Sequence, residues 1–161
     1  MIDFTAVQVH IKERGPEKAV TLMARASMMR IAERIAQREQ ASVLITGECL
    51  GQVASQTPES LAFTGSFVLL PVLRPLIGMD KIEIIERARA MGTFDISTRP
   101  YDDCCILFAP EHPLIKPDTA RLTEEYRTLE MEKLLEEAAA GREQIVFTEH
   151  TGRDDYRESP T

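Results

Sequence analysis

A chain of 161 residues with 43% hydrophobic and 28% charged side chains is long enough for one globular domain with a sizeable core. Its net charge of −7 argues against a freestanding nucleic-acid-binding protein, because phosphate contacts require a cationic surface. The acid is concentrated late in the chain, so the earlier part is closer to neutral and compatible with a basic face. That late cluster comprises Glu124, Glu125, Glu130, Glu132, Glu136 and Glu137.

The sequence shows no secretory signal near Met1 and no apolar stretch approaching the roughly twenty residues that span a bilayer. We therefore expect a cytoplasmic protein without membrane contact. In a reducing compartment its three cysteines are more often chemical or inert than bridged.

The first part of the chain alternates strand and helix patterns. Residues 3–11 alternate apolar and polar side chains, which predicts a strand. Residues 17–39 have apolar side chains at helical spacing, which predicts a helix with a methionine-rich face in the core. That face holds Val20, Ala24, Met28, Ile31 and Ile35. Residues 42–46 are a β-branched run that ends in glycine, as buried parallel strands do at their carboxyl ends.

The middle of the chain continues this alternation. Residues 50–56 predict a short helix limited by Pro58, and the later half of 67–73 predicts a strand. Asp80 and the glutamate three residues later form a capping-box pattern. The helix that they begin is expected to reach about Met91, to pack through Ile84, Ile85 and Ala88, and to stop at a glycine.

The last part predicts one helix over residues 118–140, a short strand at 145–147 and a disordered tail from 151 to 161. Alternating strands and helices indicate an α/β fold, here three layers with a mostly parallel sheet and helices on both faces. In such sheets, ligands bind outside the carboxyl ends of the strands.

The turn after residues 42–46 lies at such a strand end. Gly47 and Gly51 would let the backbone approach a ligand, and Gln56 offers a donor and an acceptor to a base edge or ribose. The same glycines also suit a tightly packed strand–helix junction with no ligand. Arg25, on the predicted helix, could reach a phosphate or a base, or could be an ordinary solvated residue.

Cys104 and Cys105 are adjacent and follow two aspartates, which raise the pKa of a thiol unless a cation offsets them. Arg74 and Arg99 are candidates for that cation. An inert buried pair is an equally ordinary interpretation. A metal site that uses Cys49, both of these cysteines and His112 lacks the spacing of known metal motifs.

Four segments of the chain are recognisable together: MMRIAERIA at 28–36, LGQVASQT at 50–57, LRPLIGMDK at 73–81 and PYDDCC at 100–105. In this order they resemble the ThiI family, the tRNA uridine 4-sulfurtransferases or tRNA 4-thiouridine synthases. The resemblance covers roughly residues 20 to 115 and implies the C-terminal half of a PP-loop ATP pyrophosphatase domain over 1–117. Residues 118–150 then form a C-terminal helix and strand.

The resemblance implies an enzyme that uses ATP and Mg²⁺ to adenylate a tRNA uridine, with sulfur then arriving as a persulfide from a cysteine desulfurase. Some members also supply sulfur for the thiazole of thiamine. Arg25, Gly47 and Gln56 match positions that contact the adenine nucleotide. Cys104 matches the family's synthetase-domain cysteine, which assists sulfur transfer; thiol chemistry suits that role because sulfur exchange proceeds by thiolate attack.

The family's Ser-Gly-Gly-x-Asp-Ser phosphate loop does not occur in these 161 residues, nor do its THUMP and rhodanese regions. We therefore expect a component that is inactive alone and contacts tRNA through other domains or a partner chain. Self-association or a complementary N-terminal partner is expected. The alternative is a non-catalytic nucleotide-binding or partner-binding remnant with a redox-active thiol.

Overall fold

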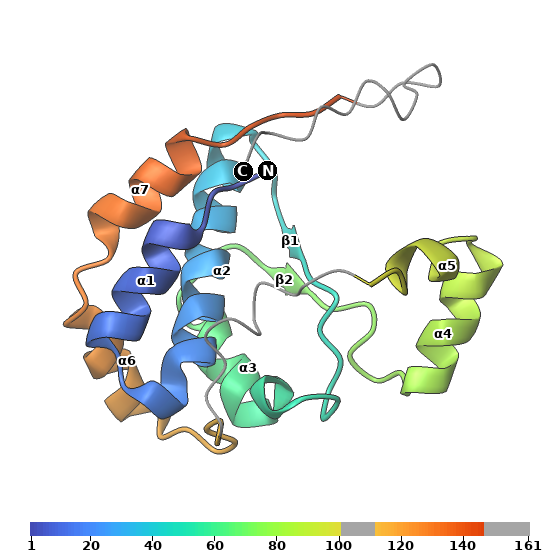
Figure 1. Ribbon diagram of the computed structural model, residues 1–161, viewed down its shortest axis with the longest axis horizontal. Helices are drawn as coiled ribbons and strands as arrows, with labels where there is room; N and C mark the ends of the chain where they lie inside the picture. Colours follow the sequence, from blue (N-terminus) through green and yellow to red (C-terminus); the bar gives the residue numbers. More distant parts are fainter. Residues whose placement is uncertain (101–111, 147–161) are drawn as a thin grey trace.

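The computed structural model describes residues 1–100 and 112–146 (Figure 1). Cys104 and Cys105, with the tail from 151 to 161, lie outside the described residues. The helices are α1 (Thr5–Arg14), α2 (Val20–Arg38), α3 (Pro58–Gly65), α4 (Lys81–Ala90), α5 (Phe94–Ser97), α6 (Thr119–Arg127) and α7 (Glu132–Ala140). Short 3₁₀ turns occur at Glu17–Ala19 and Ala54–Gln56, and the strands are β1 (Leu44–Ile45) and β2 (Val72–Leu73).

Helix α2 is the centre of the molecule, and its prediction is confirmed. It packs against α1 and α7 on one side and against α3 and β1 on the other (Figure 1). The buried surface is wider than the predicted stripe, because Leu22, Ala26 and Met29 are buried whereas Ala24 and Met28 are only half-buried. A helix that is apolar around most of its circumference is one that packs on several sides.

The two strands form a parallel sheet in which Leu44 pairs with Val72 and Ile45 with Leu73. The strands predicted at residues 42–46 and in the later half of 67–73 are confirmed. Leu44 is buried against α2, together with Met29 and Ala36. The chain is thus a mixed helix–strand protein with a small parallel sheet.

The predicted strand at residues 3–11 is wrong, because this segment is helix α1. Its apolar residues fit both the alternation of a strand and the spacing of a helix, and the observed burial follows the helical spacing. Val7 and Ile11, one turn apart, are buried against α2, while Val9 is exposed at the position where a strand would bury it.

The expected short helix at 50–56 is also wrong, apart from the 3₁₀ turn at its end. Pro58 does not end a helix but begins α3. Proline suits the first helical turn because its missing N–H would have no intrahelical partner. The Thr57 side chain caps the helix by accepting a hydrogen bond from the backbone N–H of Ser60.

Helix α4 is confirmed, including the reciprocal capping box between Asp80 and Glu83. With α5 it forms an arm that stands apart from the other helices, on the far side of the strands (Figure 1). None of its residues is fully buried, although Ile84, Ile85 and Ala88 are half-buried as their predicted packing requires.

The single helix expected over 118–140 is two helices. Glu130 adopts the left-handed conformation with φ of 50°, which turns the chain between α6 and α7. Leu129 and Met131 on either side are buried, so core packing holds the turn in place. Three arginines of α2 then pair with two glutamates of α7: Arg30 and Arg34 with Glu132, and Arg34 and Arg38 with Glu136.

Two further expectations concern the end of the chain and the membrane. Ile145 and Val146 are not in a strand, and Phe147 lies outside the described residues. Within residues 1–100 and 112–146, no helix has both the length and the apolar content needed to cross a membrane.

Candidate functional site

A pocket of about 320 Å³ opens at the carboxyl end of β1. The strand ends at Ile45, and the next three residues, Thr46 to Glu48, form one wall. Helix α2 supplies a second wall through Arg25, Met28 and Met29, and Gln56 forms the third wall. The pocket therefore lies where ligands of parallel sheets bind.

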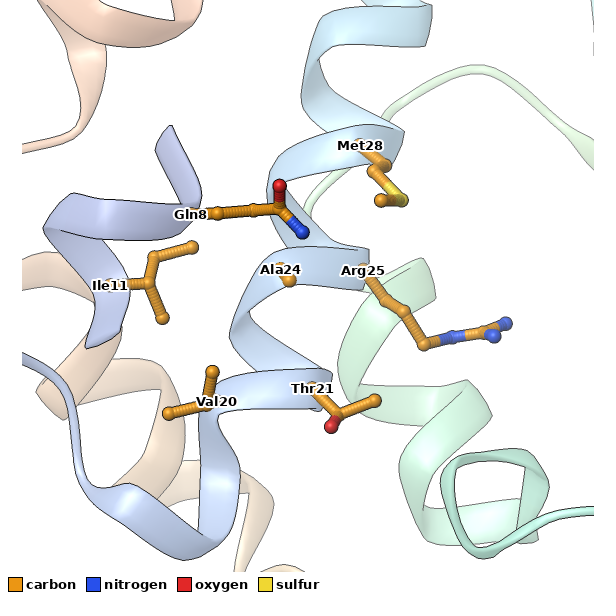
Figure 2. Close-up of a pocket in the computed structure, with 7 residues that line it drawn as sticks. All are labelled: Gln8, Ile11, Val20, Thr21, Ala24, Arg25 and Met28. Carbon is orange, nitrogen blue, oxygen red and sulfur yellow. The ribbon is translucent and has the colours of Figure 1, made fainter. Parts of the chain in front are cut away.

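Arg25 projects from α2 toward this pocket. Figure 2 shows its guanidinium extended away from Gln8 and Ile11 of α1, residues that line a second, smaller pocket together with Arg25 itself. Arg25 thus carries its charge to the strand end and is not a solvated helix residue.

Glu48 is the charged centre of the site. It is only 5% exposed, and its carboxylate accepts hydrogen bonds from Arg25 Nη2, Arg74 Nε at 2.7 Å and Thr46 Oγ1 at 2.9 Å. Burial raises the pKa of this carboxyl, but the hydrogen bonds from Arg74, Thr46 and Arg25 outweigh burial and hold the pKa below its ordinary value. Glu48 is therefore ionised at neutral pH.

The two arginines retain unused donors. Arg25 Nε and Arg74 Nη2 are buried and have no hydrogen-bond partner within the part of the chain that the structure describes. Two guanidinium groups against one carboxylate leave a net charge of about +1, and a buried cation with an unused donor favours an anionic ligand.

Gly47 and Gln56 shape the rest of the pocket. A Cβ on Gly47 would meet no atom within 4 Å, so internal packing does not explain the glycine, whereas close approach of a ligand would. Gly51 is different, since its φ of 75° itself favours glycine. Gln56 Oε1 lies 3.4 Å from the backbone N of Cys49, so this side chain also ties the loop together.

The structure therefore brings together three of the four residues proposed from the sequence: Arg25, Gly47 and Gln56. The fourth, Cys104, lies outside the described residues. Arg74, considered earlier as a cation for the cysteines, instead pairs with Glu48.

Glu48 itself was missed by sequence reasoning. The available signal was its position, a charged residue directly after the glycine that ends a buried strand. Among the described residues, no group of His, Cys, Asp and Glu side chains could hold a metal ion.

The fold and this pocket define a class: a mixed helix–strand protein with a small parallel sheet and a pocket of net positive charge at the carboxyl end of a strand. Sequence comparison identifies the family. The family model described as Thiamine biosynthesis protein (ThiI) matches residues 1–131, which is most of the chain. The chain belongs to the ThiI family, as the resemblance of its motifs indicated.

Relatives agree with this assignment. A probable tRNA sulfurtransferase of Thermoanaerobacter sp. (strain X514) is 49% identical over 136 residues, which are 84% of this chain and 36% of the relative. That of Treponema pallidum (strain Nichols) is 46% identical over 138 residues, 86% of this chain and 34% of the relative. The chain thus spans about a third of the length of these curated relatives.

A solved structure is similar as well. The crystal structure of a 4-thiouridine synthetase–RNA complex with bound ATP matches with a TM-score of 0.82 and 42% sequence identity. The match covers 88% of this chain and 37% of that one.

Proposed function

We propose that this chain is a component of an ATP-dependent tRNA uridine 4-sulfurtransferase. The observation that carries the proposal is the convergence of Arg25, Gly47 and Gln56 on one cationic pocket at the end of β1. The pocket supplies positive charge for phosphate, an unobstructed backbone beside Gly47 and an amide for a base or ribose.

In this function the pocket binds the adenine nucleotide. ATP adenylates a tRNA uridine and turns its C4 oxygen into a leaving group, and sulfur then arrives as a persulfide from a cysteine desulfurase. Cys104 is the thiol that assists the transfer, because thiolates exchange sulfur readily. A supply of sulfur for the thiamine thiazole belongs to the same proposal and is supported by the family's description.

The finer fold proposed is the C-terminal half of a three-layer PP-loop domain, over residues 1–117. The phosphate loop, the Mg²⁺ that accompanies ATP and the tRNA-binding regions come from the remaining part, in the same chain or in a partner. The fraction of each relative that the chain spans supports this arrangement.

The test is complementation. The chain is expressed in a bacterial strain that lacks its own tRNA sulfurtransferase, alone and together with the preceding part of a relative, and 4-thiouridine is measured in the purified tRNA. We expect 4-thiouridine only when both parts are present, and a Cys104→Ser variant should lose it. If neither combination restores it while the chain still binds ATP, the non-catalytic nucleotide-binding alternative holds.

Self-association, or binding to the complementary part, is expected from the exposed apolar surface beside the sheet. Ile45 in β1 is 68% exposed and Leu73 in β2 is 50% exposed, and a short parallel sheet normally has both faces covered. An apolar groove between α1 and α2, with a volume of about 490 Å³, is a second exposed apolar surface. We expect sedimentation at micromolar concentration to show oligomers.

A matched variant for this experiment is Ile45→Lys, which adds a charge at an exposed edge position and should shift the sedimentation profile toward the monomer. Val9→Lys, on the exposed side of α1, is the control and should leave the profile unchanged. A clean monomer in the unaltered chain would contradict this prediction.

A further inference from the structure

We propose that Arg74 is a positioning residue that keeps the pocket cationic: by sharing Glu48, it leaves Arg25 with charge and a donor for an anion. This inference rests on the proposed function, since the anion considered is the phosphate part of the nucleotide. Arg74 lies within the recognisable segment at 73–81, but the resemblance assigns no role to Arg74 or to Glu48.

The two arginines bind opposite oxygens of the same Glu48 carboxylate at the carboxyl ends of the strands. Arg74 follows β2 directly, and its Nε donates to Glu48 Oε2 at 2.7 Å. Arg25 reaches the other carboxylate oxygen, Oε1, from α2. Glu48, which follows β1, thus connects Arg74 after β2 to Arg25 on the central helix α2.

Arg74 does not line the pocket, although Arg25 and Glu48 do. Its Nη2 lies instead against α3, where a Cβ on Gly65 would stand 3.4 Å from that nitrogen. Arg74 therefore acts on a ligand only through Glu48 and through its charge.

Charge balance shows what Arg74 adds. Without it, Arg25 and Glu48 form a neutral pair, and an incoming phosphate competes with an ionised carboxylate for the same guanidinium. With it, the three side chains carry a net charge of about +1 in a partly desolvated setting, where a unit charge has a larger effect than in water.

The arrangement also governs the pH dependence of binding. Among the described residues, the charged groups in contact with Glu48 are Arg25 from α2 and Arg74 after β2, with the Thr46 hydroxyl beside them. Removing Arg74 leaves the effect of burial less opposed, so the pKa of Glu48 rises. In a chain without Arg74, the Arg25–Glu48 pair is neutral at a pH above that raised pKa. At a lower pH Glu48 is protonated, and the charge of Arg25 is no longer balanced by a carboxylate.

The first experiment is a calorimetric titration of the full chain with ATP, comparing the unaltered chain with Arg74→Gln. At about pH 8 we expect the variant to bind roughly tenfold more weakly, as the loss of one nearby charge predicts. Arg127→Gln removes the same charge from an exposed ion pair on α6 and should bind normally. Arg74→Gln binding equal to the unaltered chain would overturn the proposal.

Two readouts separate positioning from a merely structural role. The ratio of the two dissociation constants, in which titration of the nucleotide cancels, should shrink as the pH falls through the raised pKa of Glu48. The double variant Glu48→Gln with Arg74→Gln restores a net charge of about +1 and should bind within about threefold of the unaltered chain. A double variant no better than Arg74→Gln would refute the charge balance.

A failure of the proposed function is distinguishable from a failure of this inference. If the unaltered chain does not bind ATP, nucleotide binding by this chain is wrong, and carboxyl NMR of Glu48 decides the inference without a ligand. The resonance should titrate at lower pH in the unaltered chain than in Arg74→Gln. Identical titrations would overturn the inference, whether or not ATP binds.

Discussion

Replacing Arg25 by alanine is expected to weaken ATP binding by roughly 10- to 100-fold, the effect of losing a charge-assisted hydrogen bond worth about 1.5–3 kcal/mol. Arg25 is the cation on the pocket wall, and its Nε is buried without a hydrogen-bond partner in the described ranges. The guanidinium charge would pair with a phosphate of the nucleotide. Isothermal titration calorimetry with ATP and Mg²⁺ measures the change.

The control for this experiment is Arg127→Ala, because Arg127 pairs with exposed Glu124 one turn away and lies far along the sequence from the pocket. Arg25→Lys keeps the charge but loses the planar guanidinium, so its affinity for ATP should lie between those of the unaltered chain and of Arg25→Ala. Thermal unfolding must accompany the titration, since alanine also leaves Glu48 with one arginine. A folded Arg25→Ala chain that binds ATP normally would exclude this pocket as the phosphate site.

Where local patterns agree with tertiary packing, the sequence was a sufficient guide. Helix α2, both strands and the capping box of α4 follow from apolar spacing and from residues with defined backbone preferences. Residues 3–11 show the limit: alternation and helical spacing coexist there, and only the contact of Val7 and Ile11 with α2 decides between them.

Turns without glycine or proline were beyond sequence reasoning. Glu130 has no side-chain feature that announces a left-handed conformation, and it is held by the burial of its neighbours Leu129 and Met131. At Pro58 a clear signal was misread. Proline can either end a helix or begin one, and the cap from Thr57 shows that Pro58 begins α3.

Some residues of the candidate site could be named from the sequence, and others only from the structure. Arg25, Gly47 and Gln56 were named from their residue types and from the family resemblance, and all three line the pocket at the end of β1. Glu48 and Arg74 could not be paired from sequence, because their contact depends on the parallel register that sets the ends of β1 and β2 side by side. Long-range pairing of this kind has no local signature.

Phe63→Ala is expected to destabilise the chain by about 3–5 kcal/mol, a large part of the roughly 5–15 kcal/mol that stabilises an ordinary domain. Phe63 is fully buried in α3, its ring meets Phe67 at 5.0 Å edge to face, and Phe67 in turn meets Tyr126 of α6 at 4.6 Å. Alanine leaves a cavity where α2, α3 and α6 meet. Urea unfolding followed by circular dichroism measures the loss.

Phe94→Ala is the matched control, because Phe94 lies half-buried on α5 and stacks with Arg89 of the neighbouring α4. The arm of α4 and α5 packs on itself and makes little contact with the other helices, so the same substitution there should cost less than about 1.5 kcal/mol of global stability. Equal losses from the two variants would mean that the arm and the α2-centred core unfold as one unit. A large loss from Phe63→Ala with little loss from Phe94→Ala would show that the pocket at the end of β1, whose loop leads directly into α3, belongs to the stable core.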